Sequence, residues 1–96
     1  MQVKWLRRAL RNLEQEAAYI AQDNPRAAAA LVVEADATTR LLTQHPDMGR
    51  SGRVPGTREL ALPHFPYILP YRVKAQRVEI LRVFHTSRKW PPGFEG

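Results

Sequence analysis

The sequence predicts an α+β domain in which an N-terminal helical hairpin packs on a small antiparallel β-sheet. Two observations lead to this prediction. Apolar residues recur at helical spacing through the first half of the chain, and three short segments rich in β-branched, leucine and aromatic residues follow in the second half. With 96 residues the chain is long enough for one modest hydrophobic core, so we expect a single domain over residues 1–96.

The first half predicts a short strand and an antiparallel pair of helices. The strand covers residues 3–5, and the first helix follows with an apolar stripe at steps of four and three, formed by Leu6, Leu10, Leu13, Ala17 and Ile20. Asn24 is a suitable N-cap for a second helix, and Pro25 suits its first position because no N–H donor is needed there. The second helix carries the stripe Ala28, Leu31, Val32, Ala35, Thr38 and Leu42. It ends at His45, because a residue before a proline avoids the helical conformation.

The second half predicts a loop and three antiparallel strands. Residues 46–56 contain three glycines, two prolines and two arginines, a composition typical of a loop. The strands cover residues 57–62, 67–73 and 77–84, and the last is apolar on both faces, as in a central strand. Pro70 interrupts the middle strand and indicates a bulge or an edge position, because proline cannot donate to the ladder.

The turn between the last two strands decides which side chains share a face. If the turn has two residues, Arg72 pairs with Glu79 and shares a face with His85. A three-residue turn places Arg72 and His85 on opposite faces, unless a bulge at Pro70 intervenes. The turn sequence Ala-Gln carries none of the usual signals of a primed turn, so both registers stay open.

Composition excludes several classes of protein. The chain has no cysteine, so it offers no disulfide and no thiolate nucleophile, as expected for a cytoplasmic protein. Its N-terminus lacks the apolar segment of a signal peptide, and no long apolar run suggests a membrane span. The histidines are scattered without ligand-like spacing, and no segment resembles a calcium loop. We therefore expect no metal, no cofactor and no membrane partner.

The charge of the chain is concentrated in its second half. Residues 1–48 carry six basic and six acidic side chains, whereas residues 49–96 carry nine basic and three acidic ones, so the whole net charge of +6 belongs to the second half. The basic residues there are Arg50, Arg53, Arg58, Arg72, Lys74, Arg77, Arg82, Arg88 and Lys89. A basic surface on a rigid sheet attracts a polyanion or an acidic protein segment.

Five motifs occur in a fixed order along the chain. They are Asp23-Asn24-Pro25, His-Pro-Asp-Met-Gly-Arg at residues 45–50, Arg-Val-Pro-Gly-Thr-Arg-Glu-Leu at residues 53–60, Tyr71-Arg72-Val73, and Ile-Leu-Arg-Val-Phe-His-Thr-Ser-Arg-Lys-Trp-Pro at residues 80–91. This ordered set covers nearly the whole chain and resembles the RelE/ParE toxin family, in its ParE-like branch. The resemblance implies the toxin half of a bacterial type II toxin-antitoxin pair. It also implies a cognate antitoxin, ParD-like or RelB-like, with an acidic C-terminal segment that wraps the toxin.

Two actions share this fold in the family, so the fold does not choose between them. ParE-like members poison DNA gyrase, and RelE-like members cut mRNA in the ribosome. The Pro-Gly-Thr-Arg-Glu-Leu and His-x-x-Arg segments are more similar to ParE, so the expected function is a growth inhibitor acting on gyrase. A ribosome-dependent mRNA endonuclease is the alternative. A toxin relic that only binds its antitoxin and operator is a third hypothesis.

The nuclease alternative needs a base, an acid and cations around the phosphate, because the 2′-hydroxyl of RNA is itself the nucleophile. The resemblance assigns acid or base chemistry to His85 and phosphate stabilisation to Arg72, and Arg58 would complete the cluster. The chain lacks the lysine-rich loop that RelE has before the sheet. Each residue also has a structural interpretation: His85 as a hydrogen-bonded residue, Arg72 as the partner of Glu79, and Arg58 as the partner of a helix carboxylate such as Asp36.

A binding surface is the other role considered for the second half. We expect the antitoxin or the target to contact its basic residues and the last tryptophan: Arg50, Arg53, Arg58, Arg72, Arg82, Arg88, Lys89 and Trp90. For Trp90, packing over the edge of the core is the main expectation, and stacking on a base is the alternative.

Overall fold

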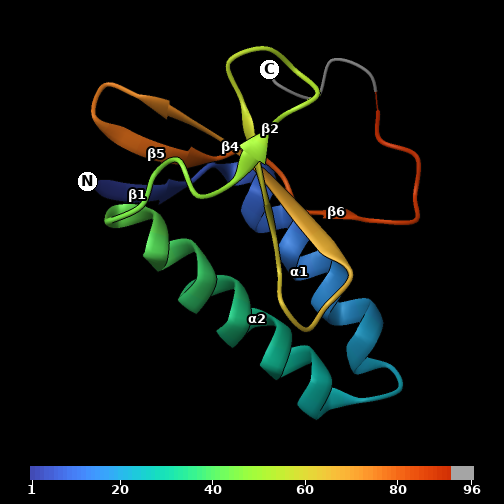
Figure 1. Cartoon of the computed structure of the whole chain (residues 1–96). Coiled ribbons are helices and arrows are strands. Elements are labelled where there is room, and N and C mark those ends of the chain that lie inside the picture. Colours follow the sequence, from blue (N-terminus) through green and yellow to red (C-terminus); the bar gives the residue numbers. More distant parts are fainter. Residues whose placement is uncertain (92–96) are drawn as a thin grey trace.

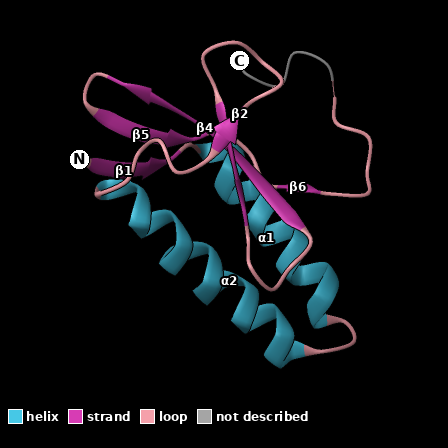
Figure 2. Ribbon diagram, in the orientation of Figure 1, coloured by secondary structure: helices cyan, strands magenta, loops and turns pink. Residues whose placement is uncertain are grey.

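The structure is a computed structural model that describes residues 1–91. Its elements are β1 (Gln2–Trp5), α1 (Arg7–Ala21), α2 (Pro25–Arg40), the short 3₁₀ helix η1 (Leu41–Thr43), β2 (Arg50–Ser51), β3 (Arg58–Ala61), β4 (Tyr67–Lys74), β5 (Arg77–Ile80) and β6 (Phe84–His85). The helices form a hairpin against one side of the sheet (Figures 1 and 2), so the predicted α+β arrangement is confirmed. We call the sheet face turned away from the helices the outer face.

The strands of residues 1–91 form one mixed sheet rather than a purely antiparallel one. Their order is β1-β5-β4-β3-β2, and β6 pairs with β4 beyond the end of β5. All neighbours are antiparallel except β1 and β5, which run parallel. The parallel pair arises because the helical hairpin and three strands lie between β1 and β5 in the chain, so β1 is not constrained by a tight turn.

The core lies between the helices and the inner face of the sheet. Strand β4 supplies alternate residues to it, Tyr67, Leu69 and Tyr71, which are all buried. The other buried members are Ala9, Leu13, Leu31, Ala35, Leu42, Leu60, Leu62, Val78, Ile80 and Val83. Val3 and Trp5 of β1 pack against this cluster, which confirms the first strand.

Two residues of the expected helix stripes lie outside the core. Leu10 is 45% exposed and Val32 is 43% exposed, so their placement in the core stripes was wrong. The helices bury small alanines instead: Ala9 next to Leu10 and Ala35 near Val32 are both fully buried. Small side chains let the helix backbones approach their neighbours closely, which turns the larger residues beside them toward solvent.

The strand expected over residues 77–84 is interrupted opposite Pro70. The bulge predicted at Pro70 is present, and its extra residue lies in the segment that faces Pro70. Strand β4 has two residues between its paired positions Ile68 and Tyr71, whereas the facing segment has three, residues 81–83, between Phe84 and Ile80. The Leu81 N–H donates to the Pro70 carbonyl at 2.8 Å. Pro70 has no N–H to return that bond, so the ladder breaks there although Pro70 lies inside the sheet and not at its edge.

Candidate functional site

Arg72 and His85 lie on opposite faces of the sheet. The hairpin turn has two residues, Ala75 and Gln76, both at positive φ (53° and 59°), and Arg72 therefore pairs with Glu79. The extra residue of the bulge reverses the side-chain direction beyond Ile80, so His85 pairs with Tyr67 on the inner face. The expectation that a two-residue turn brings Arg72 and His85 to one face was wrong, because the bulge was left out of that register.

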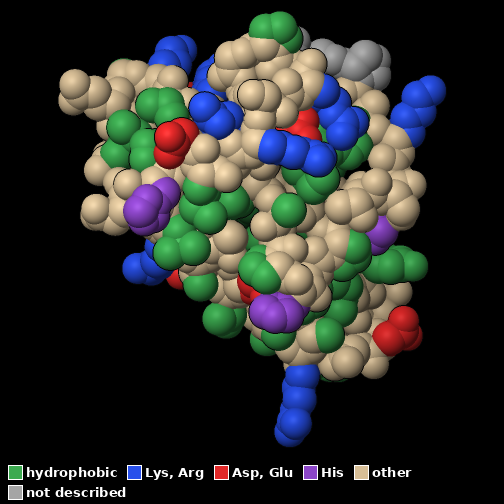
Figure 3. All heavy atoms as spheres, in the orientation of Figure 1, with side chains coloured by type: hydrophobic (Ala, Val, Ile, Leu, Met, Phe, Trp, Pro, Cys, Tyr) green, Lys and Arg blue, Asp and Glu red, His purple; other side chains and the backbone are tan. Residues whose placement is uncertain are grey.

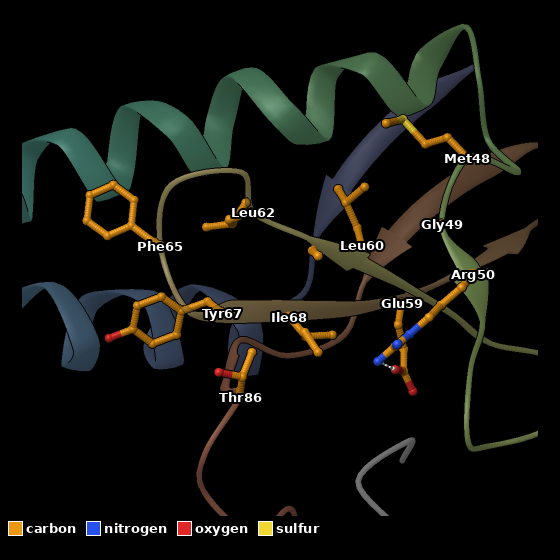
Figure 4. Close-up of a pocket in the computed structure, with 11 residues that line it drawn as sticks. Met48, Gly49, Arg50, Glu59, Leu60, Leu62, Phe65, Tyr67, Ile68 and Thr86 are labelled. Carbon is orange, nitrogen blue, oxygen red and sulfur yellow. Dashed lines mark hydrogen bonds and ion pairs between the residues drawn. The ribbon is translucent and has the colours of Figure 1, made fainter.

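Glu59 organises one end of the outer face. Its side chain is 4% exposed, and it accepts from Arg50 Nη2 at 3.2 Å and from Arg53 Nε at 3.4 Å. The backbone N–H of Arg53 also donates to this carboxylate at 2.9 Å, which fixes the loop after β2. Figure 4 shows Arg50 reaching across from β2 to Glu59 on β3. A buried carboxylate is stable only when it is paired in this way.

Glu79 has the same arrangement on β5. Its side chain is also 4% exposed, and it accepts from Arg72 Nε at 2.9 Å and from Arg77 Nη2 at 3.0 Å. The hydrogen bond from Arg72 lowers the pKa of Glu79, against the opposing effect of burial, and Arg77 lowers it further. The structural interpretation of Arg72 as the partner of Glu79 is confirmed.

The segment after β6 is attached to the outer face by Trp90. The guanidinium carbon of Arg53 lies 3.5 Å from the centre of the Trp90 ring, and Phe84 lies 4.7 Å from it between ring centroids. Trp90 therefore packs on the outer face against Arg53 and Phe84, and it is not among the residues packed against the core. Figure 3 shows Lys and Arg side chains gathered around β2 in this part of the molecule, whereas hydrophobic side chains are exposed over α2.

Arg58 lies on the inner face and holds the loop before β2. Its Nη1 donates to the carbonyls of Gly49 at 2.8 Å and Asp47 at 3.2 Å. The expected partner Asp36 instead pairs with Arg40 on the same helix. Tyr71, which faces Arg58 across the β3–β4 pair, holds the same loop, because its hydroxyl donates to the Pro46 carbonyl and accepts from the Gly49 N–H. Burial raises the pKa of Tyr71.

His85 belongs to a separate cluster at the other end of β4. Its ring lies edge-on to Tyr67 at 5.3 Å, and its Nδ1 accepts from the Ser87 N–H at 3.1 Å. The Tyr67 hydroxyl donates to Glu16 at 2.9 Å, and Arg88 Nη1 donates to the same carboxylate at 2.7 Å. Burial, with Glu16, raises the pKa of Tyr67 to about 12. His85 thus has the hydrogen bond that its structural interpretation requires.

The three candidate nuclease residues are therefore dispersed. Arg72 is on the outer face, whereas Arg58 and His85 are on the inner face at opposite ends and opposite sides of β4. Four residues along β4 and two strand spacings separate Arg58 from His85, about 16 Å between Cα atoms. General acid–base catalysis requires its groups within hydrogen-bond reach of one substrate, and these residues do not meet that requirement.

The remaining candidate contact residues lie around the C-terminal part of the sheet. Arg82, in the bulge, is partly buried, and burial with the positive charge of Arg8 lowers its pKa. Lys89 is exposed in the segment after β6. Residues 1–91 contain no group of His, Cys, Asp or Glu that could hold a metal ion, and no helix there is long and apolar enough to cross a membrane.

Two of the cavities in residues 1–91 bear on the candidate binding surfaces. A pocket of about 390 Å³ lies at the edge of the sheet along β3. Met48, Leu60, Leu62 and Phe65 line the side nearer α2, and Arg50 and Glu59 line the side away from it (Figure 4). A groove of about 360 Å³ on the helical side is lined by Trp5, Leu10, Leu13, Val32, Val33 and Asp36. The exposed residues of the helix stripes thus lie along one apolar groove.

Sequence reasoning did not single out the buried glutamates as organisers of these clusters. Glu79 lies between the apolar positions Val78 and Ile80, and Glu59 lies inside a strand pattern just before Leu60. That placement is a usable signal because a buried carboxylate needs a cationic partner. Glu16 had no comparable signal, since its partners Tyr67 and Arg88 are distant in the sequence.

Comparison with known proteins places these features in a family. Residues 3–90 match the model of the ParE toxin of the type II toxin-antitoxin system parDE. The chain is 45% identical to the Y4kP protein of Sinorhizobium fredii, covering 93% of this chain and 92% of that protein, and 34% identical to toxin RelE1 of Caulobacter vibrioides, covering 81% and 85%. A solved structure of a chromosomal ParDE system from P. aeruginosa superposes with a TM-score of 0.82 at 29% identity, covering 91% of this chain and 97% of that one. The chain therefore belongs to the ParE toxin family and is the toxin component of a type II toxin-antitoxin system.

Proposed function

We propose that this toxin arrests growth in the cytoplasm by acting on DNA gyrase, without cutting RNA itself. The observation that supports this proposal is the dispersion of Arg58, Arg72 and His85 over two faces and both ends of the sheet. An RNA endonuclease that uses the 2′-hydroxyl depends on convergent groups. A protein that blocks another enzyme by binding needs only a surface.

The mRNA endonuclease remains the second candidate because two similar proteins, from Caulobacter vibrioides, carry the names RelE1 and RelE2. In this chain the groups that do converge are Tyr67, Glu16, Arg88 and His85. The Glu16 carboxylate already accepts from Tyr67 and Arg88. Tyr67 has a pKa of about 12, so it is poorly matched to proton transfer near neutral pH.

One experiment separates these functions. The toxin is induced briefly without antitoxin, and the same cells are probed for gyrase-trapped DNA breaks and for new cleavage ends in transcripts. Trapped breaks with intact transcripts are the expected result. New transcript ends that disappear in Arg72→Ala or His85→Ala, with intact DNA, would contradict the proposal and support the nuclease. A stable, well-expressed chain that causes no growth defect would support the relic hypothesis instead.

A type II toxin has an antitoxin partner. We propose that an amphipathic, acidic segment of this antitoxin occupies the apolar groove between the helices. Leu10 and Val32 are large apolar residues exposed on the two helices, and Val33 beside Val32 is 67% exposed. The net charge of +6, carried by the second half of the chain, would attract an acidic segment to the toxin as a whole, and the apolar face of that segment would cover the groove.

Copurification tests the antitoxin site. The double variant Val32→Glu with Val33→Glu should release an antitoxin that copurifies with the wild-type toxin. Val73→Glu is the matched control, because Val73 is a similarly exposed valine on β4 rather than on the helices. Equal retention of the antitoxin by both variants would contradict the groove as its binding site.

A further inference from the structure

We propose that the outer face of the sheet binds the phosphate backbone of double-stranded DNA through two preformed arginine pairs, Arg50 with Arg53 and Arg72 with Arg77. This inference rests on the proposed function, because gyrase is an enzyme that holds duplex DNA. It adds to that function a specific contact between the toxin and the nucleic acid.

The charge balance of each pair favours an anionic ligand. Glu59 neutralises the charge of one of its two arginines, and Glu79 neutralises the charge of one of its own two. Each cluster of two arginines and one glutamate therefore keeps a net charge of +1. The glutamates are buried, whereas between 33% and 68% of each arginine side chain is exposed. A ligand approaching from solvent therefore meets the cations and not the carboxylates.

The pairs are positioned before any ligand binds. Arg72 contacts Glu79 through Nε and Arg50 contacts Glu59 through one Nη, which leaves other N–H donors of both guanidinium groups for a ligand. Arg53 is held additionally by the Trp90 ring. An arginine side chain that is already fixed loses less conformational entropy when it binds a ligand. The planar guanidinium group also presents N–H donors that match the oxygens of a phosphate.

The spacing of the pairs suits one duplex. Glu59 lies opposite Pro70 and Glu79 lies opposite Arg72, on the two strands that flank β4. Two strand spacings and two residues along the strand separate the glutamates by about 12 Å. The major groove of B-DNA is about 12 Å wide, and the arginine side chains reach beyond the Cα positions of the glutamates, so phosphates on either side of one groove can contact both pairs at once.

A duplex fits this face better than an acidic peptide does. A bound peptide takes much of its affinity from apolar anchors in pockets. The groove lies along the helices, and the pocket at the β3 edge meets this face only beside Arg50 and Glu59, away from Arg72 and Arg77. Phosphate backbone recognition needs cations on a surface and no apolar pocket. Lys74 at the end of β4 and Lys89 after β6 enlarge the basic surface of the second half.

Salt-dependent DNA binding by the full chain tests the proposal. The probe is a short fluorescein-labelled DNA duplex followed by fluorescence anisotropy across a series of salt concentrations. The wild type should bind with an affinity that falls steeply with salt, and Arg50→Gln and Arg72→Gln should each reduce the slope of log K against log salt by about 1. Arg26→Gln is the control, because it removes the same charge from an exposed position at the start of α2.

The proposal is overturned if Arg26→Gln weakens binding as much as Arg50→Gln does, or if polyglutamate of equal total charge displaces the duplex as well as unlabelled DNA does. Arg50 is the most exposed of the four arginines, so Arg50→Gln keeps the test valid if Arg72→Gln fails to fold. An assay of DNA supercoiling by gyrase distinguishes failure of the DNA site from failure of the proposed gyrase function. Inhibition by the wild type that survives in an Arg50→Gln and Arg72→Gln double variant overturns the DNA site alone. Normal DNA binding without any gyrase inhibition overturns the proposed function alone.

Discussion

Tyr71 and Gly49 are joined by a hydrogen bond so close that a side chain at position 49 would force the ring or the loop to move. The Gly49 N–H donates to the Tyr71 hydroxyl at 2.9 Å, and a Cβ on Gly49 would lie 2.6 Å from Cε1 of the Tyr71 ring. This contact fixes the loop that leads into β2 and its arginines. The geometry of the basic outer face therefore depends on a contact made on the inner face.

Substituting Gly49 should destabilise the toxin much more than substituting Gly56. Gly49→Ala should lower the free energy of unfolding by about 2–3 kcal/mol, because the ring or the loop must move. Gly56 has φ of 82° and open space around it, so Gly56→Ala should cost only about 1–2 kcal/mol from backbone strain. Chemical denaturation measures both. Equal losses would show that the loop near Gly49 adapts freely.

Removing the His85 ring should affect stability and not toxicity. His85→Ala loses the edge-on contact with Tyr67 and the acceptor for Ser87, a destabilisation of about 1 kcal/mol. Thermal unfolding measures this change, and growth arrest after induction measures activity. A variant that is fully folded at the growth temperature yet harmless would assign His85 a direct role.

Glu79 should make stability depend on pH in the acid range. Its pKa is lowered in the folded state from the ordinary value of 4.5, so the stabilisation is complete above that value and is lost as the pH falls through the folded pKa. In Glu79→Gln this contribution should be absent. The difference in unfolding free energy between wild type and variant should therefore shrink as the pH is lowered below about 4.5. A difference that does not change with pH would contradict the assignment.

Tyr67 should remain protonated to unusually high pH. Its folded pKa of about 12 lies above the ordinary 10.0, so its contribution to stability is complete below pH 10 and is lost as the pH rises toward 12. Absorbance titration of phenolate formation should show a late component that becomes smaller in Tyr67→Phe, with Tyr71 contributing what remains. The absence of any late component in the folded wild type would exclude burial of this hydroxyl against Glu16.

Local signals in the sequence predicted much of the fold because they act over a few residues. The Asn24 side chain accepts from the Ala27 N–H at 3.0 Å, and Pro25 begins α2, as its preference for the first helical position indicates. The helical periodicity also located the hairpin. It did not identify Leu10 and Val32 as exposed, since which part of an apolar stripe is buried depends on how closely neighbouring elements approach.

The sequence by itself determined the order of the elements, the basic character of the second half and the motifs of the toxin family. Only the tertiary structure decided which side chains meet. The hairpin turn uses Ala75 and Gln76 at positive φ without the usual turn residues, and the bulge opposite Pro70 adds one residue to the facing segment. Side chains alternate between faces with every residue of a strand, so this single insertion places Arg72 and His85 on opposite sides of the sheet.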